Sequence, residues 1–492
     1  CNRRLFDGAV AIHAVERMLG DRPPDEREVE PVQTREGEIA VIGSGPAGLS
    51  CAYHLARMGY VVTVFEAASE PGGMLRLGIP EYRLPRDVLD RDIDRIAGQG
   101  VDIRCGVRVG EDLPWPTVLS HFDAVFLATG AHRGRPMGVA GEDGPGVRGG
   151  LEFLREVNRG ERPDLGRRVI VVGGGNTAMD CARTAVRLGS EVTVLYRRTR
   201  REMPAIDEEV EEAEREGVQF VFLAAPAGFL REGDKLRAVE CVRMRLGEPD
   251  ESGRRRPVPT NQGVILEADT VLSAIGEASD VEALPQVVGR AGSTVFVSET
   301  GQTSYPSVFA GGDLTDQPRT VADALGAGKR AAIGIDWHLR TRAGELPGGP
   351  EFRALRFGGT GNMSVTRWRG DDPVERVSPV NEIVEFDRIN VRHFAPAPRH
   401  ADGRIPVEES RAGFAEVNRG LGRDLALQEA GRCFSCGVCN ECELCLIFCP
   451  DVAVSRRTEG KGFVVALEYC KGCGVCVAEC PRGAMVMTGE DL

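Results

Sequence analysis

Short apolar runs, separated by glycine-rich turns and helix-length segments, recur along the first two thirds of the chain. The run at residues 39–42 leads into a glycine-rich turn, a helical segment from 46 to about 58, and a second apolar run at 61–65. The same order of elements returns between residues 168 and 198. Short apolar runs bounded by turn residues are typical of buried parallel strands, and a helix between two of them completes a βαβ unit. The pattern therefore predicts an α/β protein with two nested units of this kind.

The regions outside these units show other patterns. Residues 5–19 have the spacing of an amphipathic helix, and residues 21–38 form a charged connector that contains proline. From about 340 to 425 the sequence is rich in arginine and proline, with short strand-like pieces such as 383–386. We interpret this stretch as an arm that connects the α/β units to a cysteine-rich module.

Length and charge narrow the classes of protein to which the chain can belong. A chain of 492 residues is too long for one hydrophobic core and favours about two to four domains. The net charge of −13 argues against a nucleic-acid partner, because phosphate binding needs a dense basic patch. No apolar run reaches the roughly 18 residues that a membrane-spanning helix needs. We expect a soluble protein that neither binds nucleic acid nor inserts into a membrane.

The cysteines are concentrated in one part of the chain. Ten of the fifteen lie between Cys433 and Cys480. Clustering of this kind indicates metal ligands and not disulfides, and exposed metal-bound thiolates suit a reducing compartment. We therefore expect a cytoplasmic location.

The first glycine-rich turn has the features of a dinucleotide-binding loop. Gly43 permits a tight turn from strand to helix, Gly45 lets the backbone approach a pyrophosphate, and Gly48 allows close packing of helix on strand. The N-terminus of the following helix supplies N–H groups and a positive dipole end to the phosphates. Glu66 ends the second strand, where a carboxylate can accept hydrogen bonds from ribose hydroxyls. The alternative interpretation of Glu66 is an ordinary surface acid.

The second turn differs from the first in two ways. Its third glycine is replaced by Ala178, and Arg197 and Arg198 stand where the first unit has Glu66. A missing carboxylate and two guanidiniums fit a 2′-phosphate, which favours NADP(H) over NAD(H). In the alternative interpretation, both arginines point to water. The expected contacts of this second loop are Gly173, Gly175, Asn176 and Ala178.

The cysteine-rich module contains two copies of the pattern C-x2-C-x2-C-x3-C-P. This spacing is typical of bacterial two-cluster ferredoxins, in which the cysteine next to proline ligates the other [4Fe-4S] cluster. Structural zinc sites are the alternative, and they need two separated cysteine pairs per ion. The pattern assigns the ligands of one cluster to Cys439, Cys442, Cys445 and Cys480. It assigns the ligands of the other cluster to Cys470, Cys473, Cys476 and Cys449.

Cys433 and Cys436 remain outside these two ligand sets. They resemble a cysteine pair that relatives use near their own clusters. One interpretation is a third site whose other ligands are not evident. The other is a shifted ligand set, in which Cys436 replaces one of the later cysteines.

From about residue 1 to 340 the chain resembles the small (β) subunit of bacterial glutamate synthase and related two-dinucleotide flavin oxidoreductases. The segment 71–85 looks like this family's second flavin-contacting segment, and 128–130 and 273–276 look like its crossings between flavin and nicotinamide domains. The motif at 310–313 resembles the one whose aspartate binds the flavin ribityl chain. The resemblance implies cofactor contacts from Gly73, Thr129, Gly130, Gly276, Gly312 and Asp313.

The resemblance implies FAD in the first unit and NADP(H) in the second, with NAD(H) as the alternative. The expected fold class is α/β, with two nested Rossmann-like dinucleotide-binding domains plus a small α+β ferredoxin-like domain. The expected division is an N-terminal helical remnant (1–36), an FAD-binding domain in two parts (37–140 and 276–340), an NAD(P)-binding domain (141–275), a connecting arm (341–425) and the two-[4Fe-4S] domain (426–492).

The chain also departs from its relatives. They hold iron-sulfur clusters in an N-terminal helical region through several cysteines, and here only Cys1 looks like the end of that run. Flavin disulfide reductases place a redox cysteine pair beside the flavin, and no such pair follows Gly73 or lies in the second unit. Thiol chemistry is therefore not expected. The scattered cysteines, expected to be small buried apolar residues, are Cys51, Cys105, Cys181 and Cys241.

These features predict an oxidoreductase that passes electrons between NADP(H), FAD and two [4Fe-4S] clusters. Hydride transfer needs no side-chain acid or base, so we assign no catalytic residue. The chain is expected to work as an NAD(P)H:ferredoxin-type oxidoreductase, or as the electron-input subunit of a larger reductase or synthase complex. Its expected partners are a ferredoxin or a partner redox subunit in a hetero-oligomer. The alternative from another class is a non-enzymatic assembly subunit.

Overall fold

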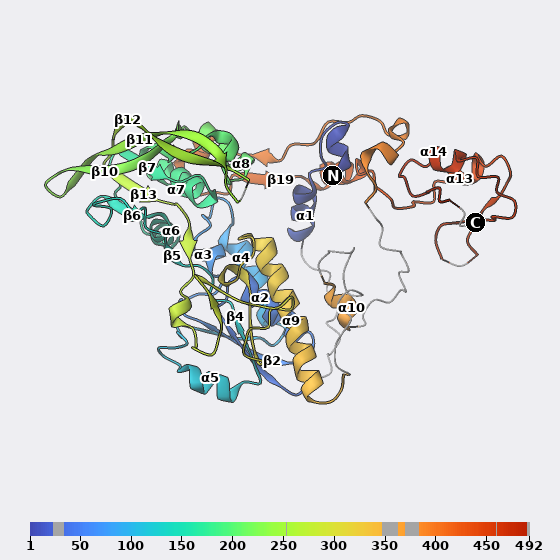
Figure 1. Ribbon diagram of the computed structural model, residues 1–492, viewed down its shortest axis with the longest axis horizontal. Coiled ribbons are helices and arrows are strands. Elements are labelled where there is room, and N and C mark those ends of the chain that lie inside the picture. The colour runs from blue at the N-terminus through green and yellow to red at the C-terminus, as the bar shows by residue number, and fades with distance from the viewer. Residues whose placement is uncertain (23–33, 252, 347–362, 370–382, 459, 490–492) are drawn as a thin grey trace.

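The computed structural model describes residues 1–22, 34–251, 253–346, 363–369, 383–458 and 460–489. The module that contains α13 and α14 lies at one end of the long axis, and the hairpin strands β10 to β12 lie at the other (Figure 1). The second large sheet adjoins the hairpin strands, and the first large sheet lies below it in this view (Figure 1). Within the described ranges, no helix combines the length and the apolar character needed to cross a membrane.

The first large sheet is parallel and has the strand order β17-β4-β1-β2-β3. Its strands are β1 (Glu38–Ile42), β2 (Val61–Glu66), β3 (Asp102–Cys105), β4 (Ala124–Leu127) and β17 (Val308–Ala310). The helices α2 (Pro46–Ala56) and α9 (Val321–Arg342) pack against each other on this sheet. The predicted strands and helix of the first unit are confirmed.

The second large sheet is also parallel and has the order β6-β13-β7-β8-β9. Its strands are β6 (Val147–Gly149), β7 (Arg168–Val172), β8 (Glu191–Tyr196), β9 (Gln219–Phe222) and β13 (Thr270–Ser273). Its helices are α6 (Gly150–Asn158), α7 (Asn176–Arg187) and α8 (Asp207–Arg215). An antiparallel sheet extends this region with β10 (Ala224–Glu232), β11 (Lys235–Pro249) and β12 (Arg255–Glu267).

The two units are nested, as the sequence predicted. Strand β17 joins the first sheet only after the chain has completed the second. The chain crosses from the first sheet to the second after β4 and returns after β13. The two crossings are hydrogen-bonded to each other, because β5 (Arg133–Gly134) pairs with β14 (Glu277–Ala278). The pair therefore holds both crossings side by side.

Smaller elements complete these regions. The short helices are α3 (Met74–Leu77), α4 (Arg86–Ala97), α5 (Trp115–His121), η2 (Arg200–Glu202), η3 (Val281–Ala283), η4 (Gly312–Leu314) and α10 (Val365–Arg369). The strands β15 (Arg290–Ala291) and β16 (Thr294–Val295) form a hairpin.

The predicted helix over 5–19 is wrong in its first half. A 3-10 turn, η1 (Asn2–Leu5), comes first, and α1 (Ile12–Gly20) begins at Ile12. Gly8 has a φ of +109°, which interrupts the helix. The carboxylate of Asp7 accepts hydrogen bonds from Arg3 and from the backbone N–H of Ala397, so tertiary contacts fix this turn. Most of the expected connector lies outside the described residues.

The arm is partly described. The expected strand-like piece at 383–386 is wrong, because residues 383–385 have no regular structure and the 3-10 turn η6 (Phe386–Arg388) follows. Its other elements are η7 (Val391–His393), β18 (Gly403–Arg404), α11 (Val407–Ala412), β19 (Asn418–Gly420) and α12 (Arg423–Gly431). Helix α12 packs against α1, so the arm and the N-terminal segment form one apolar cluster.

The cysteine-rich module consists of two similar halves. Each half has a short helix after its first cysteine pair, α13 (Leu444–Ile447) or α14 (Val475–Ala478). The antiparallel strands β20 (Val454–Arg456) and β21 (Phe463–Val465) lie between the two halves in the sequence.

Candidate functional site

The first glycine loop is shaped for close backbone approach. A Cβ on Gly43 would lie 2.5 Å from the carbonyl oxygen of Ala128, and a Cβ on Gly48 would lie 1.9 Å from that of Gly43. A Cβ on Gly45 would meet no atom within 4 Å, so open space lies over the N-terminus of α2. Two glycines are therefore required by packing, while Gly45 leaves room for a ligand.

Glu66 lies beside this loop at the end of β2. One of its carboxylate oxygens accepts hydrogen bonds from the backbone N–H of Ser44 at 2.8 Å and from the Ser44 hydroxyl at 2.5 Å. The other oxygen accepts from the N–H of Ala68 at 2.8 Å. The side chain is buried, so the interpretation of an ordinary surface acid does not describe its position.

Two distant segments close on the first loop. Gly73 has a φ of +54°, and a Cβ there would lie 2.7 Å from the Cα of Gly45. A Cβ on Gly312 would lie 2.9 Å from the Cβ of Ala47 in the first turn of α2. Asp313 follows Gly312 directly, and burial raises the pKa of its carboxyl. Residues from three parts of the sequence thus surround one helix N-terminus.

The second glycine loop repeats this arrangement at the N-terminus of α7. A Cβ on Gly173 would lie 2.2 Å from the carbonyl oxygen of Ala274, whereas a Cβ on Gly175 would meet nothing within 4 Å. Asn176 accepts a hydrogen bond from the N–H of Ile206 at 3.0 Å, and Ala178 is fully buried. The second loop therefore has the same required turn and the same open position as the first.

The crossings carry a buried hydroxyl without a partner, two glycines with positive φ and a neutral histidine. The hydroxyl of Thr129 is buried and has no hydrogen-bond partner within the described ranges. Gly130 and Gly276 have φ values of +67° and +112°, which only glycine adopts readily. Burial, together with the positive charge of Arg155, lowers the pKa of His132 to about 4, so its imidazole is neutral at pH 7.

This arrangement fits an FAD dinucleotide at the first loop. The open position at Gly45, the carboxylate of Glu66 and the buried hydroxyl of Thr129 are the kinds of group that a pyrophosphate, a ribose and a flavin contact. The open position at Gly175 provides the same fit for a second dinucleotide pyrophosphate.

The two candidate 2′-phosphate arginines have different surroundings. Arg197 is exposed and lines an open pocket together with Arg254 and Arg256 of the β11–β12 hairpin. Arg198 is buried, and its guanidinium donates to the carboxylate of Asp250 at 2.6 Å and to the backbone carbonyl of Arg255 at 2.8 Å. Asp250 also lines the pocket, so Arg198 lies beside the pocket with its guanidinium bonded to the hairpin.

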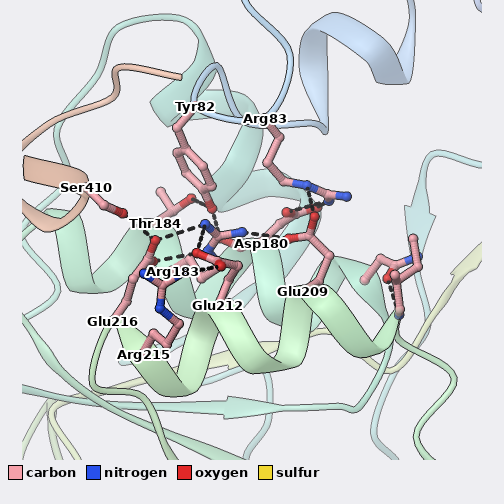
Figure 2. A network of polar contacts seen from close by, with 12 residues as sticks. Tyr82, Arg83, Asp180, Arg183, Thr184, Glu209, Glu212, Arg215, Glu216 and Ser410 are labelled. Atoms are coloured by element: carbon pink, nitrogen blue, oxygen red, sulfur yellow. Dashed lines mark hydrogen bonds and ion pairs between the residues drawn. The ribbon is translucent and has the colours of Figure 1, made fainter. Parts of the chain in front are cut away.

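A buried polar network joins the first and second units (Figure 2). Arg83, from the loop after α3, donates to Asp180 of α7 at 2.8 Å and pairs with Glu209 of α8 at 2.9 Å. The ring of Tyr82 lies under the guanidinium of Arg183, 4.9 Å from its centroid. The loop after α3 is thus bound to α7, the helix that begins at the second glycine loop.

Glu216 is the anionic centre of this network. Its carboxylate pairs with Arg183 at 2.9 Å (Figure 2) and with Arg187 at 2.6 Å, and it accepts from the hydroxyl of Ser410 in the arm at 2.5 Å. Burial opposes its ionisation, but the hydrogen bonds from Arg187 and Arg183 outweigh burial and lower its pKa to about 2. Our sequence analysis missed this network, although the acidic run at 207–216 signals a partner rich in arginine.

The thiols near Cys445 come from both ends of the cysteine-rich module. Burial raises the pKa of Cys445, and the neighbouring thiols of Cys439, Cys442 and Cys480 raise it further. Cys480 therefore lies with the first run of cysteines, although it follows the second run in the sequence. In the second run, burial and the nearby thiols of Cys470 and Cys473 raise the pKa of Cys476.

The cysteine at the end of each half accepts a backbone hydrogen bond. The N–H of Ala453 donates to Cys449 Sγ and that of Ala484 donates to Cys480 Sγ, each at 3.3 Å. Donors to sulfur of this kind are common around iron-sulfur clusters, where they tune the reduction potential. The last cysteine of each half therefore has the same backbone donor, although the described residues hold no group of three or more side chains already placed to bind a metal ion.

The scattered cysteines lie outside the cysteine-rich module, and two of them, Cys51 and Cys181, lie in α2 and α7. Cys51, Cys181 and Cys241 are buried, and burial raises the pKa of each thiol. Cys105 is only half-buried, contrary to the expectation. Each of these cysteines is a free thiol, and thiols with raised pKa values are poor nucleophiles.

Comparison with known proteins shows which family has this architecture. A family model described as pyridine nucleotide-disulphide oxidoreductase matches residues 37–328, and a 4Fe-4S binding domain model matches residues 463–486. The solved structure of Mycobacterium tuberculosis FprA in complex with NADPH shares the fold, with a TM-score of 0.56 and 19% identity over 68% of this chain and 90% of that chain.

Two curated relatives support the same placement. The chain is 43% identical over 408 residues to the NADP(+)-dependent formate dehydrogenase subunit beta of Moorella thermoacetica. The aligned region covers 81% of this chain and 54% of that protein. It is 36% identical over 356 residues to the NADPH glutamate synthase small chain of Escherichia coli K12. The aligned region covers 67% of this chain and 75% of that protein. The chain thus spans about half the length of the formate dehydrogenase subunit. It belongs to the pyridine nucleotide-disulphide oxidoreductase family of FAD- and NAD(P)-binding enzymes, is related to the glutamate synthase small chain, and carries a 4Fe-4S binding domain.

Proposed function

We propose that this chain passes electrons between NADP(H), FAD and two [4Fe-4S] clusters. The observation that carries the proposal is the presence of two open glycine loops, one in each of the two parallel sheets that the paired crossings β5 and β14 connect, with a four-cysteine 4Fe-4S pattern in each half of a separate module. When bound, a flavin exchanges two electrons with a nicotinamide and single electrons with iron-sulfur clusters. The chain's own residues bind and orient the cofactors.

The first loop is proposed to hold FAD. The N–H groups at the start of α2 face the open space beside Gly45 and would donate to a pyrophosphate. Glu66 is fixed by Ser44 and Ala68 at the end of β2, where it would accept from ribose hydroxyls. Asp313 is proposed to contact the ribityl chain and the Thr129 hydroxyl the flavin, because both lie at the ends of strands that meet this loop.

The second loop is proposed to hold NADP(H), with Arg197 as the main 2′-phosphate contact. Arg254 and Arg256 line the same pocket and add positive charge from the hairpin, and the acidic residues Asp250 and Glu251 line it as well. Arg198 acts as a positioning residue in this account, because its bonds to Asp250 and Arg255 hold the hairpin against the end of β8. NAD(H) lacks the 2′-phosphate and does not use this pocket.

Replacing Arg197 with alanine is expected to raise the KM for NADPH about 10- to 100-fold, the equivalent of one lost charge-assisted hydrogen bond. The KM for NADH should change little. Steady-state dye reduction with each nucleotide measures both values. Arg245→Ala is the matched control, because Arg245 is an exposed arginine on the same hairpin that does not line the pocket. Equal losses with NADPH and NADH would contradict the assignment of the 2′-phosphate site.

The clusters are proposed to share ligands across the two halves of the module. Cys480→Ala and Cys442→Ala should then affect the same cluster, while Cys449→Ala and Cys473→Ala affect the other. Each variant is expected to lose about four irons per chain, one cubane. Iron analysis and electron paramagnetic resonance spectra of the reduced protein measure this. If Cys480→Ala instead removed the signal that Cys473→Ala removes, the crossed assignment would be wrong.

The physiological role is proposed to be electron input to a partner redox protein. The formate dehydrogenase relative is named as a beta subunit, which favours a role within a hetero-oligomer over a free-standing enzyme. A ferredoxin is the alternative acceptor or donor. Co-purification of the native protein with a second redox subunit at equal stoichiometry tests this, and isolation as a single chain that reduces free ferredoxin would favour the alternative.

A further inference from the structure

Part of the arm crosses the boundary between the two dinucleotide-binding units. Residues 403–420, which we call the strap, consist of the paired strands β18 and β19 with the helix α11 between them in the sequence. In Figure 1, β19 lies between α8 of the second unit and the N-terminal helix α1. Arg17 in α1 donates to the backbone carbonyl of Asn418 at 2.6 Å and pairs with Glu416 at 2.7 Å, so this end of the strap is fixed.

The strap is bonded to the first unit through Tyr82, in the loop after α3. The backbone N–H of Val417 donates to the carbonyl oxygen of Tyr82 at 3.0 Å, and the N–H of Ile405 donates to the carbonyl of Val417 at 3.1 Å. The side chain of Tyr82 is fully buried and packs with Ile405, Val417 and Phe414. The strap therefore covers this loop with both a backbone hydrogen bond and an apolar cluster.

The strap is bonded to the second unit through Ser410 and Arg404. The Ser410 hydroxyl accepts a hydrogen bond from Arg187 of α7 at 2.9 Å and donates one to Glu216 at 2.5 Å. Ser410 is buried, so both bonds are shielded from water. Arg404 of β18 pairs with Glu212 of α8. The strap is thus bonded to α7 and to the C-terminal end of α8.

Phe414 contacts both units at once. Its ring centroid lies 6.3 Å from that of Tyr82 in the first unit. The guanidinium of Arg162, in the loop between α6 and β7 of the second unit, lies 4.4 Å from the same ring. Phe414 also packs against the apolar core of the second unit. One aromatic side chain of the strap therefore spans the boundary between the units.

Hydride transfer between two such units depends on their relative orientation. The reacting atoms must approach to about 3–3.5 Å, and a displacement of about 1 Å slows a reaction about 100-fold. The crossings between the units are joined by two short strands, β5 and β14. Contacts away from the crossings therefore decide how precisely the two units are held.

We propose that the strap fixes the orientation in which the two units carry out hydride transfer, with Phe414 and Ser410 as positioning residues. In that step the C4–H bond of NADPH breaks and an N5–H bond forms on the flavin. Two electrons and one proton move together, so NADPH is oxidised to NADP+ and FAD is reduced to FADH−. The effect of the strap on this step rests on the proposed function, whereas its contacts with both units do not.

The first test compares Phe414→Ala with the unaltered protein, both as the full chain loaded with FAD and mixed anaerobically with NADPH. The rate of flavin reduction at saturating NADPH is expected to fall about 10- to 100-fold. The NADPH concentration that gives half of this rate should stay the same, because Phe414 belongs to neither glycine loop. Phe414→Leu keeps an apolar contact and should restore most of the rate. Leu427→Ala is the matched control, since Leu427 is a 57% exposed residue of the arm outside the strap.

The second test needs no cofactor. Amide hydrogen exchange of the peptide that contains Val417 is followed by mass spectrometry in flavin-free protein, because the Val417 N–H is bonded to Tyr82. Exchange in Phe414→Ala is expected to be about tenfold faster. Arg404→Glu is a second variant, which opposes Glu212 with a like charge and leaves no cavity in the apolar cluster. It should change the exchange and the rate in the same direction, and it serves if Phe414→Ala does not fold.

Three results would overturn the proposal. Faster exchange with an unchanged rate of flavin reduction would show that the strap does not position the units for hydride transfer. A slower rate that saturating NADPH restores would mean that Phe414 supports nucleotide binding. Unchanged exchange in both variants would show that these side chains do not hold the strap. A flavin that NADPH does not reduce in the unaltered protein would be a failure of the proposed function, and the exchange result distinguishes it from a failure of the strap.

Discussion

Replacing Glu216 with alanine is expected to lower the free energy of unfolding by about 3–5 kcal/mol, because two buried guanidiniums lose their shared anion. The side chains of Arg183 and Arg187 are 2% and 0% exposed, so water cannot replace the carboxylate. Urea unfolding followed by far-UV circular dichroism measures the change. Glu191→Ala is the matched control, since Glu191 pairs with Arg167 at 2.8 Å on an exposed surface, where such pairs contribute about 0–1 kcal/mol.

Glu216→Gln provides a second variant that keeps the shape of the side chain. It retains an acceptor for the Ser410 hydroxyl but removes the charge, so its loss of stability should lie between those of the unaltered protein and the alanine variant. A loss no larger than that of Glu191→Ala for either variant would show that the network does not hold the two units and the arm together.

The stability that Glu216 contributes should decrease at low pH. The pKa of Glu216 is about 2 in the folded protein, below the ordinary value of 4.5. The stability that its ionised form contributes is therefore fully present above pH 4.5 and is lost as the pH falls towards 2. The difference in stability between unaltered protein and Glu216→Ala should stay constant from pH 8 to about pH 5 and shrink at lower pH. A difference that grows as the pH falls would contradict the assignment of Glu216 as the anion.

Replacing Gly45 with valine is expected to leave the fold intact and to reduce bound FAD to below about a tenth of the unaltered content, because the side chain occupies the space of the pyrophosphate. Gly45 has a φ of −70° and a ψ of 178°, an extended conformation that valine adopts readily. A Cβ there meets no atom within 4 Å. Flavin released by heat denaturation and quantified by absorbance measures the occupancy.

Gly175→Val is the matched control for Gly45→Val. Gly175 has the same open surroundings and an extended backbone at the second loop. This variant should retain FAD and lose affinity for NADPH, whereas Gly45→Val should lose FAD. If the Gly175 variant lost FAD and the Gly45 variant kept it, the assignment of cofactors to the two loops would be reversed.

The local features of the fold could be predicted from the sequence. Strands β1, β2, β7 and β8 are short apolar runs, and the glycines between strand and helix mark where each unit begins. The steric roles of Gly43 and Gly48 follow from spacing alone, because the turn and the packing of helix on strand are set within a few residues. The nested order of the units also followed from these local signals and from family resemblance.

Features that depend on distant partners could not be predicted in this way. Arg198 was expected at a 2′-phosphate, but Asp250, on a hairpin 52 residues away, holds its guanidinium. The helix expected from residue 5 is replaced by a turn that Asp7 forms with Arg3 and Ala397, and Ala397 lies 390 residues away. The amphipathic spacing of residues 5–19 carries no information about such contacts.

The Glu216 network and the surroundings of Cys436 are long-range features of the same kind. Arg183 and Ser410 belong to separate parts of the sequence, and only the folded chain brings both to the Glu216 carboxylate and places Tyr82 against Arg183. The spacing of Cys433 and Cys436 suggested a ligand pair, but the contact with Asn2 required the tertiary structure. The acidic run of α8 was the one local signal in the sequence that indicated basic partners for this helix.

The central claim is that NADP(H), flavin and iron-sulfur clusters form one path for electrons, and anaerobic rapid mixing tests it most directly. Protein of known flavin and iron content is mixed with NADPH or with NADH, and the absorbance of flavin and of the clusters is followed separately. The account predicts that the flavin bleaches first and the clusters follow, and that both are faster with NADPH than with NADH. A fully loaded flavin that stays oxidised with either nucleotide would contradict the account and favour a structural role for the cofactors.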